Sequence, residues 1–193
     1  MYQDAFSTFP ILETKNLILR KLNESDAETM QEYLQDPLIL SFTDYPSHFE
    51  VLDVIKIWNN EAYNPNGMIR WCIALKANNR CIGNIYIFNP HGDEASGRRM
   101  DIGYEISPQY RNNGYATEAI KRVVLFGFEK MGLKRVQAQV IPENIASIKV
   151  CEKSGFIKEG TLRNYCHYQF SSKLKTMVMM ACIPSDLGIE DKL

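Results

Sequence analysis

The sequence has few of the residues that mark specialised classes of protein. Its 193 residues include five cysteines, an odd number with no CxxC pair, so we expect no disulfide framework and a reducing compartment. Glycine and proline number only 11 and 8, which excludes collagen-like and low-complexity chains. The three histidines lie far apart, and no cluster of histidine, cysteine and carboxylate has metal-ligand spacing. We therefore expect no metal site.

Long apolar segments are also missing. The longest uninterrupted apolar run, Met177 to Ile183, is far shorter than the roughly 20 residues that a membrane-spanning helix needs. The first ten residues contain an early acid and lack a basic segment followed by an apolar one, so they do not resemble a signal sequence. These absences predict a cytoplasmic protein without a membrane partner.

Excess charge of one sign is missing from the whole chain but not from its parts. The net charge is −1, from 22 basic and 23 acidic side chains, which argues against a general nucleic-acid-binding protein. Residues 1–97 carry 7 basic and 13 acidic groups, whereas residues 98–158 carry 11 basic and 6 acidic groups. The total therefore hides an acidic and a basic segment, and the basic segment calls for an anionic partner.

Hydrophobic residues make up 45% of the chain, enough for the core of one domain. We assign residues 1–193 to a single domain with a core at about 10–183 and short flexible tails. Hydrophobic periodicity predicts strands at 17–22, 68–75, 81–88, 99–106 and 136–140, two more after 156, and helices beginning near 25, 51, 115 and 144. Because hairpins and helical crossovers are mixed, we expect an α+β (α/β three-layer) domain with a mixed sheet.

Residues 109–114 form a short polar loop between a predicted strand and the longest predicted helix. The first backbone N–H groups of a helix lack partners and lie at the positive end of its dipole, so such a loop can bind phosphate. Gly114 would let the backbone approach a ligand closely, and Arg111 adds a positive charge. An ordinary polar loop before a helix has the same composition, so both interpretations stand on this evidence.

Three blocks of the sequence, in order, resemble one superfamily. Residues 107–119 (SPQYRNNGYATEA) resemble the acetyl-CoA pyrophosphate loop of the GNAT N-acetyltransferases. Residues 13–20 with 26–27, and residues 144–147 with 152–156, resemble the opening segment and the second cofactor motif of the ribosomal-protein alanine/serine N-acetyltransferase group (RimJ/RimL type). This resemblance implies a GNAT-like, mostly antiparallel sheet of six to seven strands with about four helices and a splayed parallel pair, whose strands end near Ile106 and Val140.

The resemblance implies an N-acetyltransferase that uses acetyl-CoA as co-substrate, without a metal. The acceptor is a primary amine, and a protein N-terminal α-amine of the ribosomal-protein type is the leading candidate. A small amine (a polyamine, an aminoglycoside or an amino-acid derivative) is the alternative acceptor. A non-catalytic acetyl-CoA-sensing module is a further alternative. Direct nucleic-acid binding is not implied, and either a monomer or a homodimer fits.

The resemblance also assigns residues to the cofactor. The backbone of Ile106 and Ser107 would pair with the pantetheine arm as an added strand does. Asn144 and Ser147 would contact the same arm, although their positions equally suit helix capping. The family loop has glycine where this chain has Asn112, and asparagine tolerates positive φ, so we expect the loop to keep its shape. The residues expected to hold the pyrophosphate are Arg111, Asn112, Asn113, Gly114, Tyr115, Ala116 and Thr117.

Acetyl transfer needs a neutral amine, and amines are mostly protonated at neutral pH, so a general base is useful. Glu105, on the strand before the loop, is the candidate base, and an ion pair with a nearby arginine or lysine is the alternative. In the family a tyrosine acts as general acid at the position of Cys151. A thiol can donate a proton, but a buried cysteine is often a small hydrophobic residue, and the reaction can proceed without a dedicated acid. The basic segment is then interpreted as facing the cofactor, and the acidic one as facing the amine.

Overall fold

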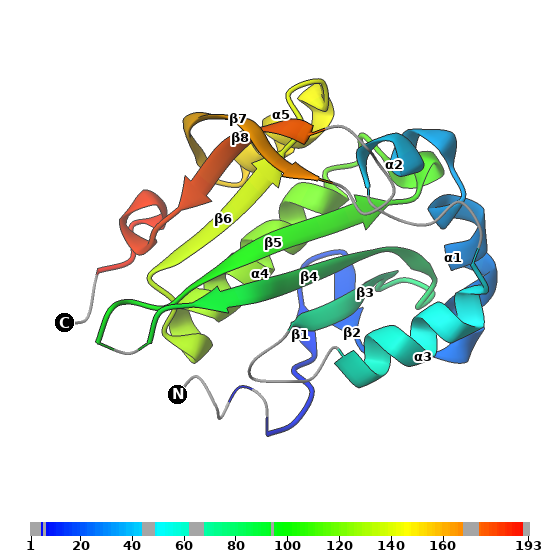
Figure 1. Ribbon diagram of the computed structural model, residues 1–193. Coiled ribbons are helices and arrows are strands. Elements are labelled where there is room, and N and C mark those ends of the chain that lie inside the picture. The colour runs from blue at the N-terminus through cyan, green and yellow to red at the C-terminus, as the bar shows by residue number, and fades with distance from the viewer. Residues whose placement is uncertain are drawn as a thin grey trace.

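The computed structural model describes residues 5, 7–43, 49–61, 68–93, 95–167 and 174–190 (Figure 1). The described strands are β1 (Leu12–Glu13), β2 (Leu17–Arg20), β3 (Ile69–Leu75), β4 (Cys81–His91), β5 (Arg99–Ile106), β6 (Arg135–Val140), β7 (Ile157–His167) and β8 (Leu174–Cys182). They form one sheet in the order β1-β2-β3-β4-β5-β6-β8-β7, and only β5 and β6 are parallel neighbours. The mixed, mostly antiparallel α+β fold is therefore confirmed.

The described α-helices are α1 (Ala27–Leu34), α2 (Pro37–Phe42), α3 (Val51–Glu61), α4 (Tyr115–Met131) and α5 (Ile145–Lys153). Eight strands and five α-helices in the described segments exceed the six to seven strands and four helices expected. The additions are β1 and α2, and both are too short to show a periodicity. Among the described residues no helix has the length and hydropathy of a membrane span.

Helix α2, which was not predicted, begins at Pro37, shortly after α1 ends. The Asp36 carboxylate accepts hydrogen bonds from the backbone N–H groups of Leu38 and Ile39, both at 3.1 Å, and Pro37 occupies the first helical position. Aspartate as N-cap with proline next is a strong start signal, because proline lacks an N–H that the helix could not satisfy there. Pro37 therefore follows α1 and also opens α2.

The pattern Ser25-Asp26-Ala27-Glu28 predicts a capping box with Ser25 as the N-cap of the first helix, and this prediction is wrong. A 3-10 turn, Glu24–Asp26, precedes α1, and the Asp26 carboxylate accepts from the Asn23 backbone N–H at 2.9 Å. The same carboxylate accepts two hydrogen bonds from the Arg20 guanidinium, both at 2.8 Å. The buried ion pair with β2 fixes the turn at Asp26, so the chain enters the helix through this carboxylate rather than through the serine hydroxyl.

Helices cover both faces of the sheet, and Figure 1 shows α4 behind the sheet and α3 in front of it. The rear core contains alternate residues of the central strands, such as Trp71, Ile85 and Met100, packed with α4. The front core joins α1 and α3 to β3 and β4 through residues such as Tyr33 and Ile55. Successive residues of β4 and β5 therefore face different layers.

The parallel pair opens into a splay. Strands β5 and β6 pair only at Arg99↔Arg135, Met100↔Val136 and Asp101↔Gln137. Beyond these positions β5 stays paired with β4 as far as Ile106, and β6 stays paired with β8 as far as Val140. The expected splayed pair is confirmed, and its open end lies near the loop that precedes α4.

Candidate active site

The loop before α4 has the backbone geometry of an anion site. Gly114 is the N-cap of α4 with φ 80°, and Asn112 has φ 63°, so both occupy the left-handed region. The expectation that asparagine supports the loop in place of glycine is confirmed. The first N–H groups of the helix, at Tyr115, Ala116 and Thr117, have no acceptor within the helix and stand at its positive end. The loop can therefore bind phosphate oxygens.

Arg111 connects this loop to the end of β5. Its Nε donates to the Ile106 carbonyl oxygen at 3.2 Å, and its Nη2 lies 3.8 Å from the Asp36 carboxylate. The Asn113 side chain donates to the carbonyls of Tyr110 and Arg111 at 3.2 and 3.0 Å, which closes the turn. Arg111 thus shapes the splayed strand end as well as adding charge, a role that the sequence did not indicate.

The residues expected to contact pantetheine lie on the two sides of the splay. The Ser107 N–H donates to the Ile82 carbonyl oxygen on β4 at 2.8 Å, so this amide hydrogen-bonds within the sheet, and the Ile106 carbonyl oxygen accepts from Arg111. Asn144, just after β6, accepts from the Ser147 N–H at 3.1 Å and caps α5, so the capping interpretation is confirmed. Both sides of the splay are therefore held in place by local hydrogen bonds.

Glu105 faces the front layer. Its side chain is 7% exposed, and its residue pairs with Asn84 across the β4–β5 ladder. Asn84 is fixed in orientation, because its Oδ1 accepts from Arg70 at 2.6 Å and its Nδ2 donates to the Tyr33 hydroxyl at 3.2 Å. Burial raises the pKa of Tyr33 well above its usual value, and the charges of Cys81 and Glu105 add to this, so the phenol stays protonated.

A buried cation lies on the same face as Glu105. The Arg70 guanidinium carbon is 3.8 Å from the ring centre of Trp58 and 3.7 Å from that of Tyr86, so the side chain is stacked between two aromatic rings. A Cβ at Gly103 would lie 2.5 Å from the Tyr86 ring, so glycine lets Tyr86 cross β5. No local pattern of the sequence predicts this group, and the one signal for it is Gly103 inside an alternating strand.

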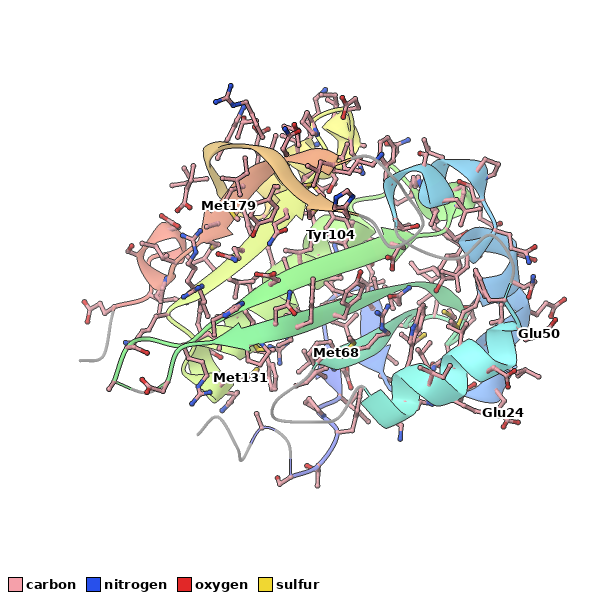
Figure 2. All side chains as sticks on the ribbon, viewed as in Figure 1. Glu24, Glu50, Met68, Tyr104, Met131 and Met179 are labelled. Atoms are coloured by element: carbon pink, nitrogen blue, oxygen red, sulfur yellow. The ribbon has the colours of Figure 1, made fainter. Side chains whose placement is uncertain are left out.

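A hydroxyl cluster spans the splay on the rear face. The Tyr104 hydroxyl lies 2.8 Å from Ser147 Oγ and 4.0 Å from Cys151 Sγ, so Tyr104 connects β5 to α5. Figure 2 labels Tyr104 among the side chains. Cys151 is 0% exposed, and burial raises the pKa of its thiol to about 11. Burial also raises the pKa of Tyr104 well above its usual value. The family motif places the proton donor at position 151 on α5, so the motif gives no indication of Tyr104 on β5.

A family model for the acetyltransferase (GNAT) domain matches residues 16–157. The chain belongs to the GNAT acetyltransferase family. The uncharacterized N-acetyltransferase YoaA of Bacillus subtilis is 35% identical over 180 residues, which cover 92% of this chain and 99% of YoaA. The family and the activity class implied by the sequence, an acetyl-CoA-dependent N-acetyltransferase, are confirmed.

Two solved structures share the fold of this GNAT chain. The ribosomal-protein-S5-alanine acetyltransferase from Vibrio fischeri superposes with a TM-score of 0.75 and 21% identity, over 90% of this chain and 96% of the other. Spermidine N-acetyltransferase from Vibrio cholerae, in complex with CoA and spermine, superposes with a TM-score of 0.73 and 18% identity, over 90% and 98%. Proteins with different acceptors therefore share this architecture.

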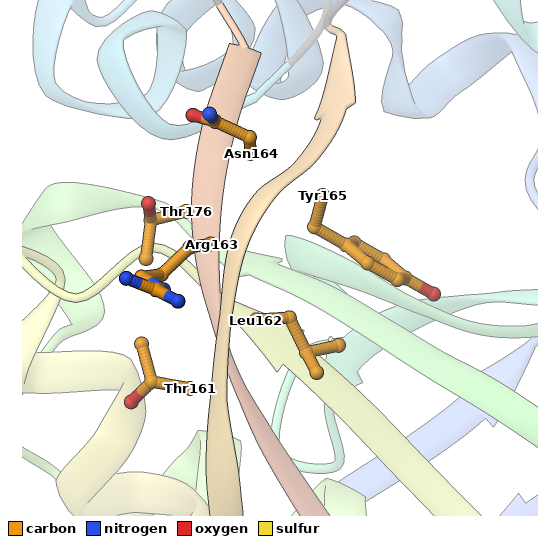
Figure 3. Close-up of a pocket in the computed structure, with 6 residues that line it drawn as sticks. All are labelled: Thr161, Leu162, Arg163, Asn164, Tyr165 and Thr176. Atoms are coloured by element: carbon orange, nitrogen blue, oxygen red, sulfur yellow. The ribbon is translucent and has the colours of Figure 1, made fainter.

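Strand β7 of the GNAT domain forms a largely exposed edge of the sheet, paired with β8. Asn164 has φ 50°, and the β7–β8 register shifts between Leu162 and Cys166, so β7 bends there. Figure 3 shows Leu162 and Tyr165 on one side of β7, and Tyr165 is 46% exposed. An open groove of about 680 Å³ is lined by Thr161, Leu162, Arg163, Asn164, Tyr165 and Thr176.

The structure brings together three residues of metal-binding types, one aspartate and two cysteines, that lie apart in the sequence. Ligand atoms of Asp26, Cys72 and Cys81 lie within 4.8 Å of one another, and all three residues are buried. Both oxygens of Asp26 already accept hydrogen bonds from Arg20, so the guanidinium balances this carboxylate. The cluster therefore consists of the Arg20–Asp26 ion pair and two neighbouring thiols. Its residues come from or lie beside strands β2, β3 and β4.

The left-handed conformation of Asn112 predicts how two substitutions at this position affect CoA binding. Replacing Asn112 with valine should weaken CoA binding about tenfold, because a β-branched residue at positive φ costs about 1–2 kcal/mol and the loop would relax away from its binding shape. Replacing Asn112 with glycine should leave binding unchanged, because glycine adopts the same φ freely. Calorimetric titration with CoA distinguishes the two. Equal affinities would show that the left-handed residue is not needed for binding.

Proposed function

We propose that this enzyme transfers the acetyl group of acetyl-CoA to a protein N-terminal α-amine. The observation that carries the proposal is that one carboxylate, Glu105, shares the front face of the sheet with a buried guanidinium, Arg70. The other buried carboxylate of β5, Asp101, already accepts from three amide side chains. The Glu105 carboxylate attracts an acceptor that carries one positive charge, whereas the fixed Arg70 cation repels the additional positive charges of a polycation.

The names of the structural relatives are compatible with this acceptor. One is a ribosomal-protein-S5-alanine acetyltransferase, and another is a RimJ protein from Mycobacterium smegmatis in complex with CoA-disulfide. The spermidine enzyme shares the fold as well, so the fold does not select the acceptor. The charges on the front face are the basis for preferring an N-terminal amine.

The described residues fit acetyl-CoA, which supplies the activated thioester. The left-handed turn at Gly114 and the free first-turn N–H groups of α4 suit the pyrophosphate. The opening between Ile106 and Val140 leaves β5 and β6 unpaired along one edge, where an extended arm can hydrogen-bond as an added strand. Asn144 and Ser147 stand on the α5 side of this opening.

Glu105 acts as the base in this mechanism. The incoming ammonium group gives a proton to the carboxylate, directly or through water, and the neutral amine then attacks the thioester carbonyl. The C–S bond breaks as the amide forms, and the departing thiolate takes a proton. The paired hydroxyls of Tyr104 and Ser147 are assigned to this proton in place of Cys151, because the Cys151 thiol is fully enclosed whereas Tyr104 is only partly buried.

The assignment of the proton donor predicts a measurable loss. Replacing Tyr104 with phenylalanine should lower kcat about tenfold, a loss of about 1.4 kcal/mol in transition-state stabilisation, because the proton-donating hydroxyl is removed; the KM for acetyl-CoA should stay within about twofold. Replacing Cys151 with alanine should change kcat by less than about twofold, because a shielded thiol gives up no proton. The reverse ranking would return the acid role to Cys151.

The acceptor is tested by competition in one reaction. Peptides with a free N-terminus, the same peptides with a blocked N-terminus and an internal lysine, and spermidine are mixed with acetyl-CoA, and the products are identified by mass spectrometry. The proposal expects acetylation of the free N-terminus. Preferential acetylation of spermidine would identify a small-amine enzyme, and tight CoA binding without any product would identify an acetyl-CoA sensor. Either of these results would overturn the proposal.

A further inference from the structure

The closed end of the splay is held by one carboxylate. Asp101 and Gln137 are the last residues that pair between β5 and β6. Asp101 Oδ1 accepts from Gln137 Nε2 at 2.7 Å, and Asp101 Oδ2 accepts from Gln139 Nε2 at 3.3 Å. Gln139 lies beyond the last pair, in the part of β6 that diverges. A single side chain on β5 therefore binds β6 on both sides of the point where the strands separate.

The hydrogen bonds continue across neighbouring strands. Asn89 on β4 donates to Asp101 Oδ2 at 3.2 Å. On the other side, Arg135 Nε donates to Gln137 Oε1 at 2.9 Å, and the Arg135 guanidinium binds both oxygens of Glu159 on β7 at 2.7 and 2.6 Å. The side chains of β4, β5, β6 and β7 thus form one continuous polar network at this level of the sheet.

Because this network is buried, its polar groups must satisfy their hydrogen bonds with one another. Asp101 is 4% exposed and Gln137 is 9% exposed. A buried carboxylate is tolerated only when donors satisfy it, and the three amides do so here. The carboxylate offers each glutamine NH₂ group an oxygen of its own, whereas an asparagine would face one glutamine with its NH₂ group unless that amide turned over, and Arg135 holds the Gln137 amide in place. The two glutamines therefore hold a defined distance between the strands.

We propose that the Asp101 clamp (Asp101, Gln137 and Gln139) sets the width of the splay and thereby positions the pantetheine arm of acetyl-CoA. These three are positioning residues, because they act through the two strands rather than on the reacting atoms. The inference rests on the proposed insertion of pantetheine between β5 and β6. The nucleotide end of CoA is assigned to the loop before α4, which the clamp does not contact.

The test compares two ligands that differ in the arm. Replacing Asp101 with asparagine should weaken binding of CoA about tenfold, the effect of losing one charge-assisted hydrogen bond. Binding of adenosine 3′,5′-bisphosphate, which has the nucleotide of CoA without the arm, should be unchanged. Replacing Asp93 with asparagine is the matched control. Its carboxylate also accepts several hydrogen bonds, but in an exposed turn, and this variant should bind both ligands like the wild type.

A charge swap separates positioning from general instability. Replacing Gln139 with glutamate should weaken CoA binding, because two facing carboxylates repel each other and widen the splay. Combining Gln139→Glu with Asp101→Asn should restore much of the affinity, because an amide again faces a carboxylate. Lower melting temperatures for both single variants, with an unchanged ratio of the two ligand affinities, would overturn the clamp. A wild-type protein that binds CoA no more tightly than the bisphosphate would instead refute the arm's placement.

Discussion

Replacing Glu105 with glutamine should lower kcat for amine acetylation about 10²-fold or more at neutral pH, which is the usual effect of removing a general base. Glutamine keeps the size of the buried side chain opposite Asn84, so the ladder between β4 and β5 should survive. Initial rates at saturating acetyl-CoA, followed by release of the CoA thiol, give the comparison. Affinity for CoA should stay within about twofold, because the loop before α4 and the splay are untouched.

The pH dependence of this variant adds a second measurement. An N-terminal α-amine has a pKa of about 8, so the neutral form becomes abundant above that pH without help from the enzyme. The deficit of the glutamine variant should therefore shrink as the pH rises. Replacing Glu129, exposed near the end of α4, with glutamine is the matched control and should leave the whole profile unchanged. A constant, small deficit at every pH would remove Glu105 as the base.

The strand that carries Glu105 was predictable because its pattern is local. Alternation along 99–106 places Tyr104 and Glu105 on opposite faces, and the structure agrees. The partner strand of each residue was not predictable. The contact between Arg70 and Asn84, and the stacking of Arg70 on Trp58 and Tyr86, join three elements whose register no local pattern records. Periodicity indicates which face is buried, and the opposing residue comes from tertiary structure.

The errors in the secondary structure have the same origin. Ser25 fits a capping pattern, but the pairing of Asp26 with Arg20 on β2 decides where the helix begins. Helix α2 has six residues, fewer than two helical turns, so its start signal was available and its periodicity was not. The Tyr104 hydroxyl near Cys151 was not predictable for the same reason, because Tyr104 lies on β5 and Cys151 lies on α5. Motifs locate positions on one segment and do not reveal which neighbours supply the chemistry.

Replacing Gly83 with alanine should strongly destabilise the pairing of β4 with β5. Gly83 pairs with Ile106 on β5, and a Cβ at Gly83 would overlap the Glu105 carbonyl oxygen and lie 3.1 Å from the Ile106 Cα. Both contacts are with backbone, which cannot rotate away as a side chain can. The strands must therefore separate, and we expect a loss of about 3 kcal/mol in the free energy of unfolding, measured by urea denaturation.

Gly160 on β7 provides the matched control, because a Cβ there would have no neighbour within 4 Å. Its alanine variant should unfold within about 0.5 kcal/mol of the wild type. The Gly83 variant should also lose activity beyond its loss of stability, since the displaced segment of β5 carries Glu105 and leads into the splay. Wild-type stability in the Gly83 variant would contradict the close approach of β4 to β5. Lost stability with full activity in the remaining folded protein would instead show that the carboxylate position is not critical.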